Sequence, residues 1–165
     1  MPVRRAVRTA AVTLALTAAA LTGGCGVGPS GVEDGGEAPT GLASGPTLYF
    51  VDDDGRLRPD ARDTGRLGTV LGAIQLLMAD GSPTQPGLHS EIPATATRTV
   101  VEDAGDYVTI YLPLRSAEIS PAGMDQIICT AAAVVSASGR DVADVAITVR
   151  PTHGDVVARP CPVTG

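Results

Sequence analysis

Residues 120–139 read SPAGMDQIICTAAAVVSASG, and this stretch decides the fold because it holds the start, the stop and the periodicity of one long helix. Ser120 is a favoured helix-capping residue, and Pro121 suits the first helical position, where no N–H is required. Gly139 is a natural terminator. Between them, apolar residues recur three and four positions apart, as in a helix that buries one face: Met124, Ile127, Ile128, Ala131, Val134 and Val135.

The same periodicity predicts an earlier helix within residues 66–81, RLGTVLGAIQLLMADG. Its expected N-cap is Asp63 or Thr64, and Gly81 followed by Pro83 provides the stop. The apolar positions that should face the core are Leu67, Val70, Leu71, Ile74, Leu77 and Met78.

Short β-rich runs surround these two helices. They are expected at residues 47–51, 97–102, 107–112 and 144–149, with a turn at 103–106 that makes the middle pair a hairpin. A further turn at 152–155 leads into an optional extra strand near the C-terminus. The order β, α, β, β, α, β predicts an α+β fold: a two-layer sandwich in which both helices cover one face of a single sheet.

The N-terminus has the pattern of an export signal. Arg4, Arg5 and Arg8 precede an uncharged run over residues 9–21, and at about 1.5 Å per residue this run is too short for a ~30 Å membrane core. LTGGC, residues 21–25, is similar to the lipobox of bacterial lipoproteins, in which the cysteine is acylated and becomes the new N-terminus. We therefore expect a signal peptide over residues 1–24 and lipidation at Cys25. An incidental thiol is the alternative, and the choice between Sec and twin-arginine export stays open.

The segment after the cysteine predicts a tether. Residues 25–46 are rich in Gly and Pro and show no apolar period, so they cannot bury enough surface to fold. The domain proper is expected at residues 47–165, held by the bilayer on the extracytoplasmic face of the cell membrane. Cleavage before Cys25 removes three arginines and no acid and changes the formal charge from −6 to −9, which argues against nucleic acid as a partner. All twelve basic residues are arginine, a composition that indicates a GC-rich, actinobacterial source.

Once Cys25 is assigned to the anchor, Cys129 and Cys161 remain as an even pair. In an oxidising compartment such a pair usually forms a disulfide. A metal site would need more ligands than two cysteines without nearby histidines, and the spacing is not that of a CxxC redox pair. The predicted bond joins the second helix to the C-terminal strands.

Several runs together resemble the GerMN domain of spore germination and sporulation proteins, which occurs also in actinobacterial envelope lipoproteins. They are LYFVDDDGRLRP at 48–59, LLMADGSPTQPGLHSEIP at 76–93, VTIYLP at 108–113, QIICTAAAV at 126–134 and DVAITV at 144–149. The most telling are the loop at 81–93 and the Gln-apolar-apolar-x-Thr run at 126–130. The resemblance implies a binding or assembly module at the cell envelope, with no enzymatic activity and no cofactor, whose partner is an envelope protein or peptidoglycan.

The sequence gives little support for a metal site or a catalytic site. Asp52, Asp53 and Asp54 precede a glycine but lack the later ligands of an EF-hand, so a solvated turn is expected rather than a metal site. His89 and His153 are expected to be surface imidazoles. No G-x-S-x-G elbow is present, so a secreted hydrolase is the least favoured function, and a small-ligand or glycan binder is the alternative to the interaction module. Charges near strand ends receive no ligand role from the sequence: Glu91, Arg98 and Arg115.

Overall fold

The computed structural model describes residues 45–63, 68–79 and 81–163. The predicted signal peptide, Cys25 and the tether as far as residue 44 lie outside these ranges. The elements in chain order are β1 (Thr47–Asp52), β2 (Leu57–Ala61), α2 (Val70–Ala79), β3 (Leu88–His89), β4 (Val100–Asp103), β5 (Tyr107–Tyr111), η2 (Ser116–Glu118), α3 (Pro121–Ala137), η3 (Val142–Asp144), β6 (Ala146–Arg150) and β7 (Val157–Ala158). Within the described part of the chain, no helix is both long enough and apolar enough to cross a bilayer.

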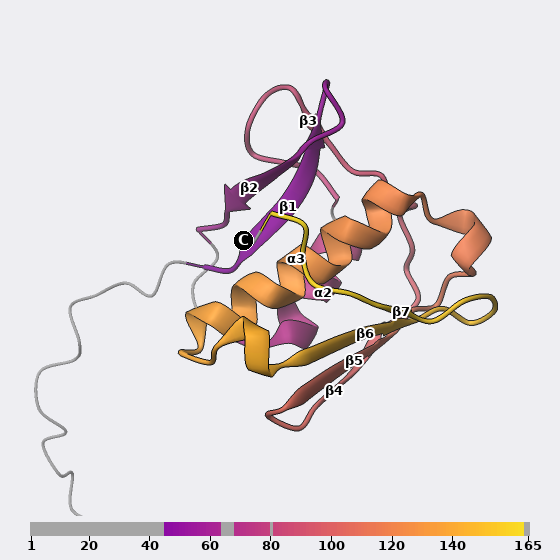
Figure 1. The fold of residues 1–165 in the computed structure, drawn as a ribbon. Coiled ribbons are helices and arrows are strands. Elements are labelled where there is room, and N and C mark those ends of the chain that lie inside the picture. The colour runs from indigo at the N-terminus through magenta and orange to yellow at the C-terminus, as the bar shows by residue number, and fades with distance from the viewer. Residues whose placement is uncertain (1–44, 64–67, 80, 164–165) are drawn as a thin grey trace, which may run out of the picture. The chain divides into compact units, whose positions relative to one another are not determined.

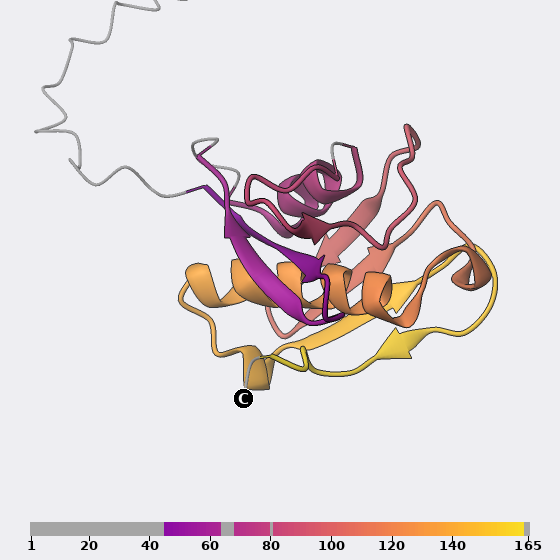
Figure 2. The same ribbon diagram turned by 90° about the horizontal axis from the view of Figure 1, so that it is seen from above.

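The strands form two sheets, and α3 lies between them (Figures 1 and 2). One sheet has the order β2-β1-β3, and both of its strand pairs are antiparallel. The other has the order β4-β5-β6-β7, in which β5 and β6 run parallel because α3 carries the chain back between them. Both helices cover the same face of this four-stranded sheet, as Figure 2 shows from above.

The α+β class is thus confirmed, whereas the single sheet must be corrected. β1 does not pair with the strands of the larger sheet, because β2 pairs along one of its edges and the short β3 along part of the other. The sequence does not predict two of the strands: β2, because RLRPDAR contains a proline and four charges, and β3, which has two residues inside the proline-rich loop. The hairpin β4–β5 and the extra strand β7 are present as expected.

Helix α3 begins and ends where the sequence predicts. The Ser120 side chain accepts a hydrogen bond from the Gly123 N–H, and Pro121 is the first helical residue. At the other end Gly139 adopts a φ of 82°, which only glycine takes without strain. The Arg140 N–H then donates to the Val135 carbonyl and the Gly139 N–H to the Ser136 carbonyl, so these two carbonyls of the last turn have partners.

Two polar side chains on α3 form hydrogen bonds with the part of the β1 edge that does not pair with β3. Tyr49 lies opposite Pro59, which has no N–H, so the backbone groups of Tyr49 point away from β2. Its N–H donates to the Thr130 hydroxyl at 3.0 Å, and its carbonyl accepts from the Gln126 amide at 3.0 Å. Because Gln126 and Thr130 are one helical turn apart, α3 provides the hydrogen bonds that another strand would otherwise make.

Helix α2 starts later than the sequence suggested. Its first residue is Val70, and the Thr69 hydroxyl accepts from the Gly72 N–H, so Thr69 is the cap instead of Asp63 or Thr64. Thr64 and Leu67 lie outside the described residues. Val70, Ile74, Leu77 and Met78 are buried as predicted, but Leu71 is 36% exposed because the stripe facing the core is narrower than the apolar pattern.

A C-terminal strap, residues 157–161, runs along α3 and is fastened twice. Arg159 forms an ion pair with Asp125 at 2.7 Å, and Cys161 forms the predicted disulfide with Cys129, with the two Cα atoms 4.8 Å apart. Asp125 and Cys129 are one turn apart on the helix. Both cysteines are buried, so the bond is shielded from solvent.

Candidate functional site

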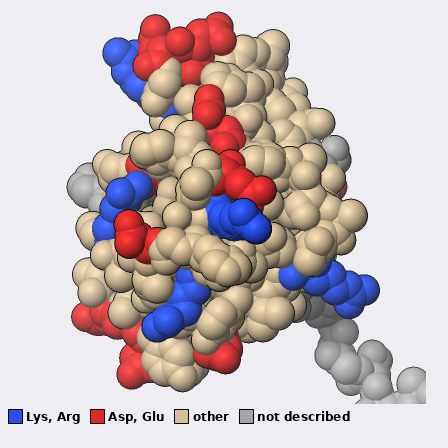
Figure 3. Space-filling model, turned by 90° about the vertical axis from the view of Figure 1, so that its right-hand side faces the viewer, with Lys and Arg blue, Asp and Glu red and all other residues tan. Residues whose placement is uncertain are grey.

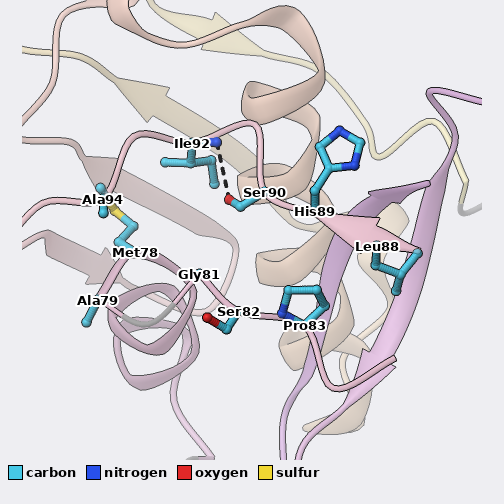
Figure 4. Close-up of a pocket in the computed structure, with 10 residues that line it drawn as sticks. All are labelled: Met78, Ala79, Gly81, Ser82, Pro83, Leu88, His89, Ser90, Ile92 and Ala94. Atoms are coloured by element: carbon cyan, nitrogen blue, oxygen red, sulfur yellow. Dashed lines mark hydrogen bonds between the residues drawn. The ribbon is translucent and has the colours of Figure 1, made fainter. Parts of the chain in front are cut away.

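A groove of about 470 Å³ lies between the end of α2 and the loop at 81–94 (Figure 4). Its walls combine small side chains, hydroxyls and apolar side chains. The loop has little regular structure, since only Leu88 and His89 pair as a strand. The residues that line the groove are Met78, Ala79, Gly81, Ser82, Pro83, Leu88, His89, Ser90, Ile92 and Ala94.

The buried carboxylate of Asp60, on β2, holds the first half of this loop. It accepts hydrogen bonds from the Thr84 N–H at 2.8 Å, from the Thr84 hydroxyl and from the Gln85 amide at 3.4 Å. The guanidinium of Arg62 lies 3.5 Å away. Burial opposes the ionisation of Asp60, but the hydrogen bonds from Thr84 and Gln85 and the charge of Arg62 outweigh it and lower its pKa.

Arg62 adds a second contact to the same part of the loop. It donates to the Ser82 carbonyl, and its guanidinium carbon lies 5.3 Å from the centre of the Phe50 ring, within the range of a cation–π interaction. Together, Asp60 and Arg62 fasten residues 82–85 to the β1–β2 hairpin.

The second half of the loop is held by α3. The Glu91 N–H donates to the side-chain oxygen of Gln126 at 2.7 Å. The loop passes so close to the helix that a Cβ on Gly123 would lie 2.5 Å from the Glu91 carbonyl oxygen. A glycine is therefore required at this crossing, and the groove wall is fixed at both ends before any ligand arrives.

Two polar side chains of the groove contact groups within the loop itself. The Ser90 hydroxyl accepts from the Ile92 N–H at 3.2 Å, and the His89 ring nitrogen lies 3.2 Å from the Glu91 carboxylate. Figure 4 shows the imidazole of His89 directed away from Ser82. A serine nucleophile needs its base within hydrogen-bond reach, and His89 does not take that position toward Ser82 here. Across the described residues, no three His, Cys, Asp or Glu side chains gather as a metal site would require.

A second hollow of about 300 Å³ lies on the other side of Met78, along residues 95–99. Arg98 lines it, and the Thr99 hydroxyl contacts the Met78 sulfur at 3.0 Å. Met78 thus separates two neighbouring hollows around the end of α2.

The other charged residues that the sequence singled out do not converge on one site. Glu91 pairs with His89, the Arg115 N–H donates to the Glu118 carboxylate, and His153 is exposed. On the face seen in Figure 3, most of the surface is uncharged, and acidic and basic side chains are scattered over it, with acidic residues gathered near the top and along the lower edge.

The aspartates at 52–54 form the turn of the β1–β2 hairpin, as expected. The Asp52 carboxylate accepts from the N–H groups of Asp54 and Arg56 and from the Arg58 side chain. The hydrogen bond from Arg58, followed by that from the Arg56 N–H, lowers the pKa of Asp52. Gly55 takes a φ of 77° at this turn.

No protein-family model matches the chain, and no curated protein does. A solved structure is similar. It contains the tandem GerMN domains of the sporulation protein GerM from Bacillus subtilis, with a TM-score of 0.44 and 17% sequence identity. The match covers 78% of this chain and 49% of that one, so this chain spans about half the length of the structure that it matches.

Replacing Asp60 with asparagine should lower the free energy of unfolding by about 1–3 kcal/mol at neutral pH, because an amide cannot accept all the hydrogen bonds of the carboxylate. The folded pKa of Asp60 is lowered, so its contribution is present above the unfolded value of about 3.9 and is lost as the pH falls through the folded pKa. Urea unfolding at pH 7 and below pH 4 should show the two proteins converging in acid. Asp106→Asn, at an exposed position, is the control. If the stability difference between the wild type and Asp60→Asn did not change with pH, this role of the Asp60 carboxylate would be contradicted.

Proposed function

We propose that the chain is a lipoprotein anchored by acylated Cys25 on the outer face of the cell membrane, and that its GerMN-like domain is a non-catalytic protein-interaction module. The sequence at 21–28 supports the anchor, since it ends an apolar run with small residues and a cysteine. The Gly- and Pro-rich composition of residues 25–46 supports a tether, because a Gly-rich chain of 22 residues has a reach of roughly 25 Å. The occupant that we propose for the groove is an extended segment of an envelope protein.

The observation that carries this proposal is the attachment of the 81–94 loop. Asp60 and Arg62 hold one end of the loop and Gln126 the other, so the groove wall is ordered without a ligand. A preformed surface loses less conformational entropy on binding, which favours recognition. The wall offers the hydroxyl of Ser82 and the apolar side chains of Leu88 and Ile92, a mixture that suits a peptide backbone with apolar side chains.

One experiment in intact cells tests both parts of this function. A photo-crosslinking amino acid in place of Ser82 should give a discrete adduct with one envelope protein, whereas the same group in place of the exposed Asp155 should not. In parallel, Cys25→Ser should move the chain from the membrane fraction to the soluble fraction, because acyl chains provide the anchor.

Each of the two measurements can contradict its own part of the proposal without affecting the other part. Unchanged fractionation of Cys25→Ser would refute the lipid anchor. Equal adducts at both positions, or no adduct at the groove, would refute the groove as the contact surface.

A further inference from the structure

The outer face of the four-stranded sheet is a second surface with its own chemistry. Val108, Ile110, Ile147 and Val149 point toward the helices and are buried. Alternate residues point to the opposite face of the sheet. Both helices lie on the other side of the sheet from this face (Figures 1 and 2). This outer face consists of Val100, Glu102, Tyr107, Thr109, Tyr111, Ala146, Thr148, Arg150 and Ala158.

Two of the three tyrosines in the chain lie on this face, on one strand. Tyr107 is 45% exposed and Tyr111 38%, and four residues along a strand place them about 13 Å apart. The register puts Val100, Tyr111 and Arg150 in one row across three strands. The Tyr111 hydroxyl donates to the Glu102 carboxylate at 3.0 Å, which holds its ring in place on the sheet. The face therefore presents two spaced aromatic rings, of which that of Tyr111 is held by a hydrogen bond.

The charge of the outer face indicates a neutral ligand. It has one acid, Glu102, and one base, Arg150, so their formal charges cancel. Between them lie the hydroxyls of Thr109 and Thr148, which occupy facing positions on β5 and β6. A neutral ligand with many hydroxyls matches this pattern better than an anionic surface or a nucleic acid does.

The size of the face argues against a second protein. Five residues at about 3.3 Å give roughly 17 Å of length, and three strand spacings of about 4.8 Å give roughly 14 Å of width. The resulting area is on the order of 240 Å², well below the ~800 Å² per partner of a stable protein interface. A chain of a few sugar rings, whose C–H faces stack on aromatic rings, is of the right size.

We propose that this outer face binds a glycan strand of the cell wall, built from neutral N-acetylated sugars. Tyr107 and Tyr111 stack on sugar rings, Thr109 and Thr148 bond to ring hydroxyls, and Val100 and Ala146 contact the acetyl methyl groups. The inference rests on the proposed location outside the membrane, where such polymers occur, but not on the partner of the groove. The domain would then join a protein at one surface to the wall at another.

Calorimetric titration of the purified protein with the hexamer of β-1,4-linked N-acetylglucosamine tests the proposal. The hexamer should bind, and Tyr107→Ala and Tyr111→Ala should each weaken binding about three- to tenfold, through the loss of ring stacking. Tyr107→Phe should bind within about twofold of the wild type, because the ring remains. Val156→Ala removes an exposed apolar side chain outside this face and is the matched control.

Sedimentation with isolated wall sacculi should show the same ranking of variants. Each tyrosine side chain is more than a third exposed, so the thermal midpoints should stay close to that of the wild type, and a loss of binding can be assigned to the face. Failure of the hexamer to bind, or binding by both alanine variants with the affinity of the wild type, would overturn the proposal. A dimer in analytical ultracentrifugation that Tyr111→Ala abolishes would assign the face to a second copy instead. Neither result bears on the fractionation of Cys25→Ser.

Discussion

Replacing both Cys129 and Cys161 with alanine is expected to lower the free energy of unfolding by about 3–4 kcal/mol. The bond joins residues separated by 32 positions, and in the chain-entropy model a loop of this size restricts the unfolded state by that amount. Urea unfolding of the double variant beside the oxidised wild type measures the difference. For a domain with one Phe and no Trp, this is a large part of the stability.

The neighbouring ion pair provides a matched comparison at the same strap. Arg159 and Asp125 are 44% and 22% exposed, so Arg159→Ala should cost less than about 1 kcal/mol. If the double cysteine variant and Arg159→Ala lowered the free energy of unfolding by the same amount, the strap would be held by general packing rather than by the disulfide. Peptide mapping without reductant should recover the linked pair, and two free thiols in the native protein would contradict the structure.

Replacing Gln126 with leucine is expected to lower the free energy of unfolding by about 2–5 kcal/mol. Gln126 is fully buried, and its amide bonds both the Glu91 N–H and the Tyr49 carbonyl. Leucine has a similar size but leaves both backbone groups without a partner, at about 1–3 kcal/mol each. Denaturant unfolding followed by circular dichroism measures the loss.

Gln75→Leu on α2 is the control, because Gln75 is only half-buried and makes no such bridge in the described residues. Hydrogen exchange of the Tyr49 and Glu91 amides distinguishes local from global loosening. Protection of the Glu91 amide should fall most, since Gln126 is its acceptor. If the leucine variant were as stable as the wild type, the role of Gln126 in joining β1, the loop and α3 would be refuted.

The regular elements could be predicted because their signals are local. Ser120, Pro121 and Gly139 act within a turn of their own positions, and the apolar period of α3 needs no knowledge of its neighbours. The alternation of Val108 and Ile110 likewise reveals which side of β5 is buried. The disulfide followed from counting cysteines once Cys25 was assigned elsewhere.

The division into two sheets could not be predicted, because it depends on contacts between distant residues. The residues RLRPDAR do not by themselves indicate a strand. In the structure Pro59 lies opposite Tyr49, whose backbone groups point away from β2, so the N–H that proline lacks is not needed for a hydrogen bond between the two strands. Asp60 was overlooked for a similar reason: its burial depends on Thr84 and Gln85, more than twenty residues later. In the structure Asp60 lies on the same side of the β1–β2 pair as Leu48 and Phe50, but the sequence gives neither the strand nor its register.

The groove depends on the same distant contacts. The sequence marks the loop at 81–93 as distinctive, but its fixed shape comes from Asp60, Arg62 and Gln126, which lie outside it. Gln126 and Thr130 belong to the Gln-apolar-apolar-x-Thr run on which the GerMN resemblance partly rests. Their hydrogen bonds to Tyr49 give that run a structural explanation: it completes the edge of β1.

The bonds between Tyr49 and α3 also set an order of events during synthesis. They join residues 77 and 81 positions apart, so β1 leaves the ribosome long before its partners exist. At about 5–20 residues per second, the first hairpin waits on the order of 4–16 s for α3. During that interval the edge of β1 is open to other chains.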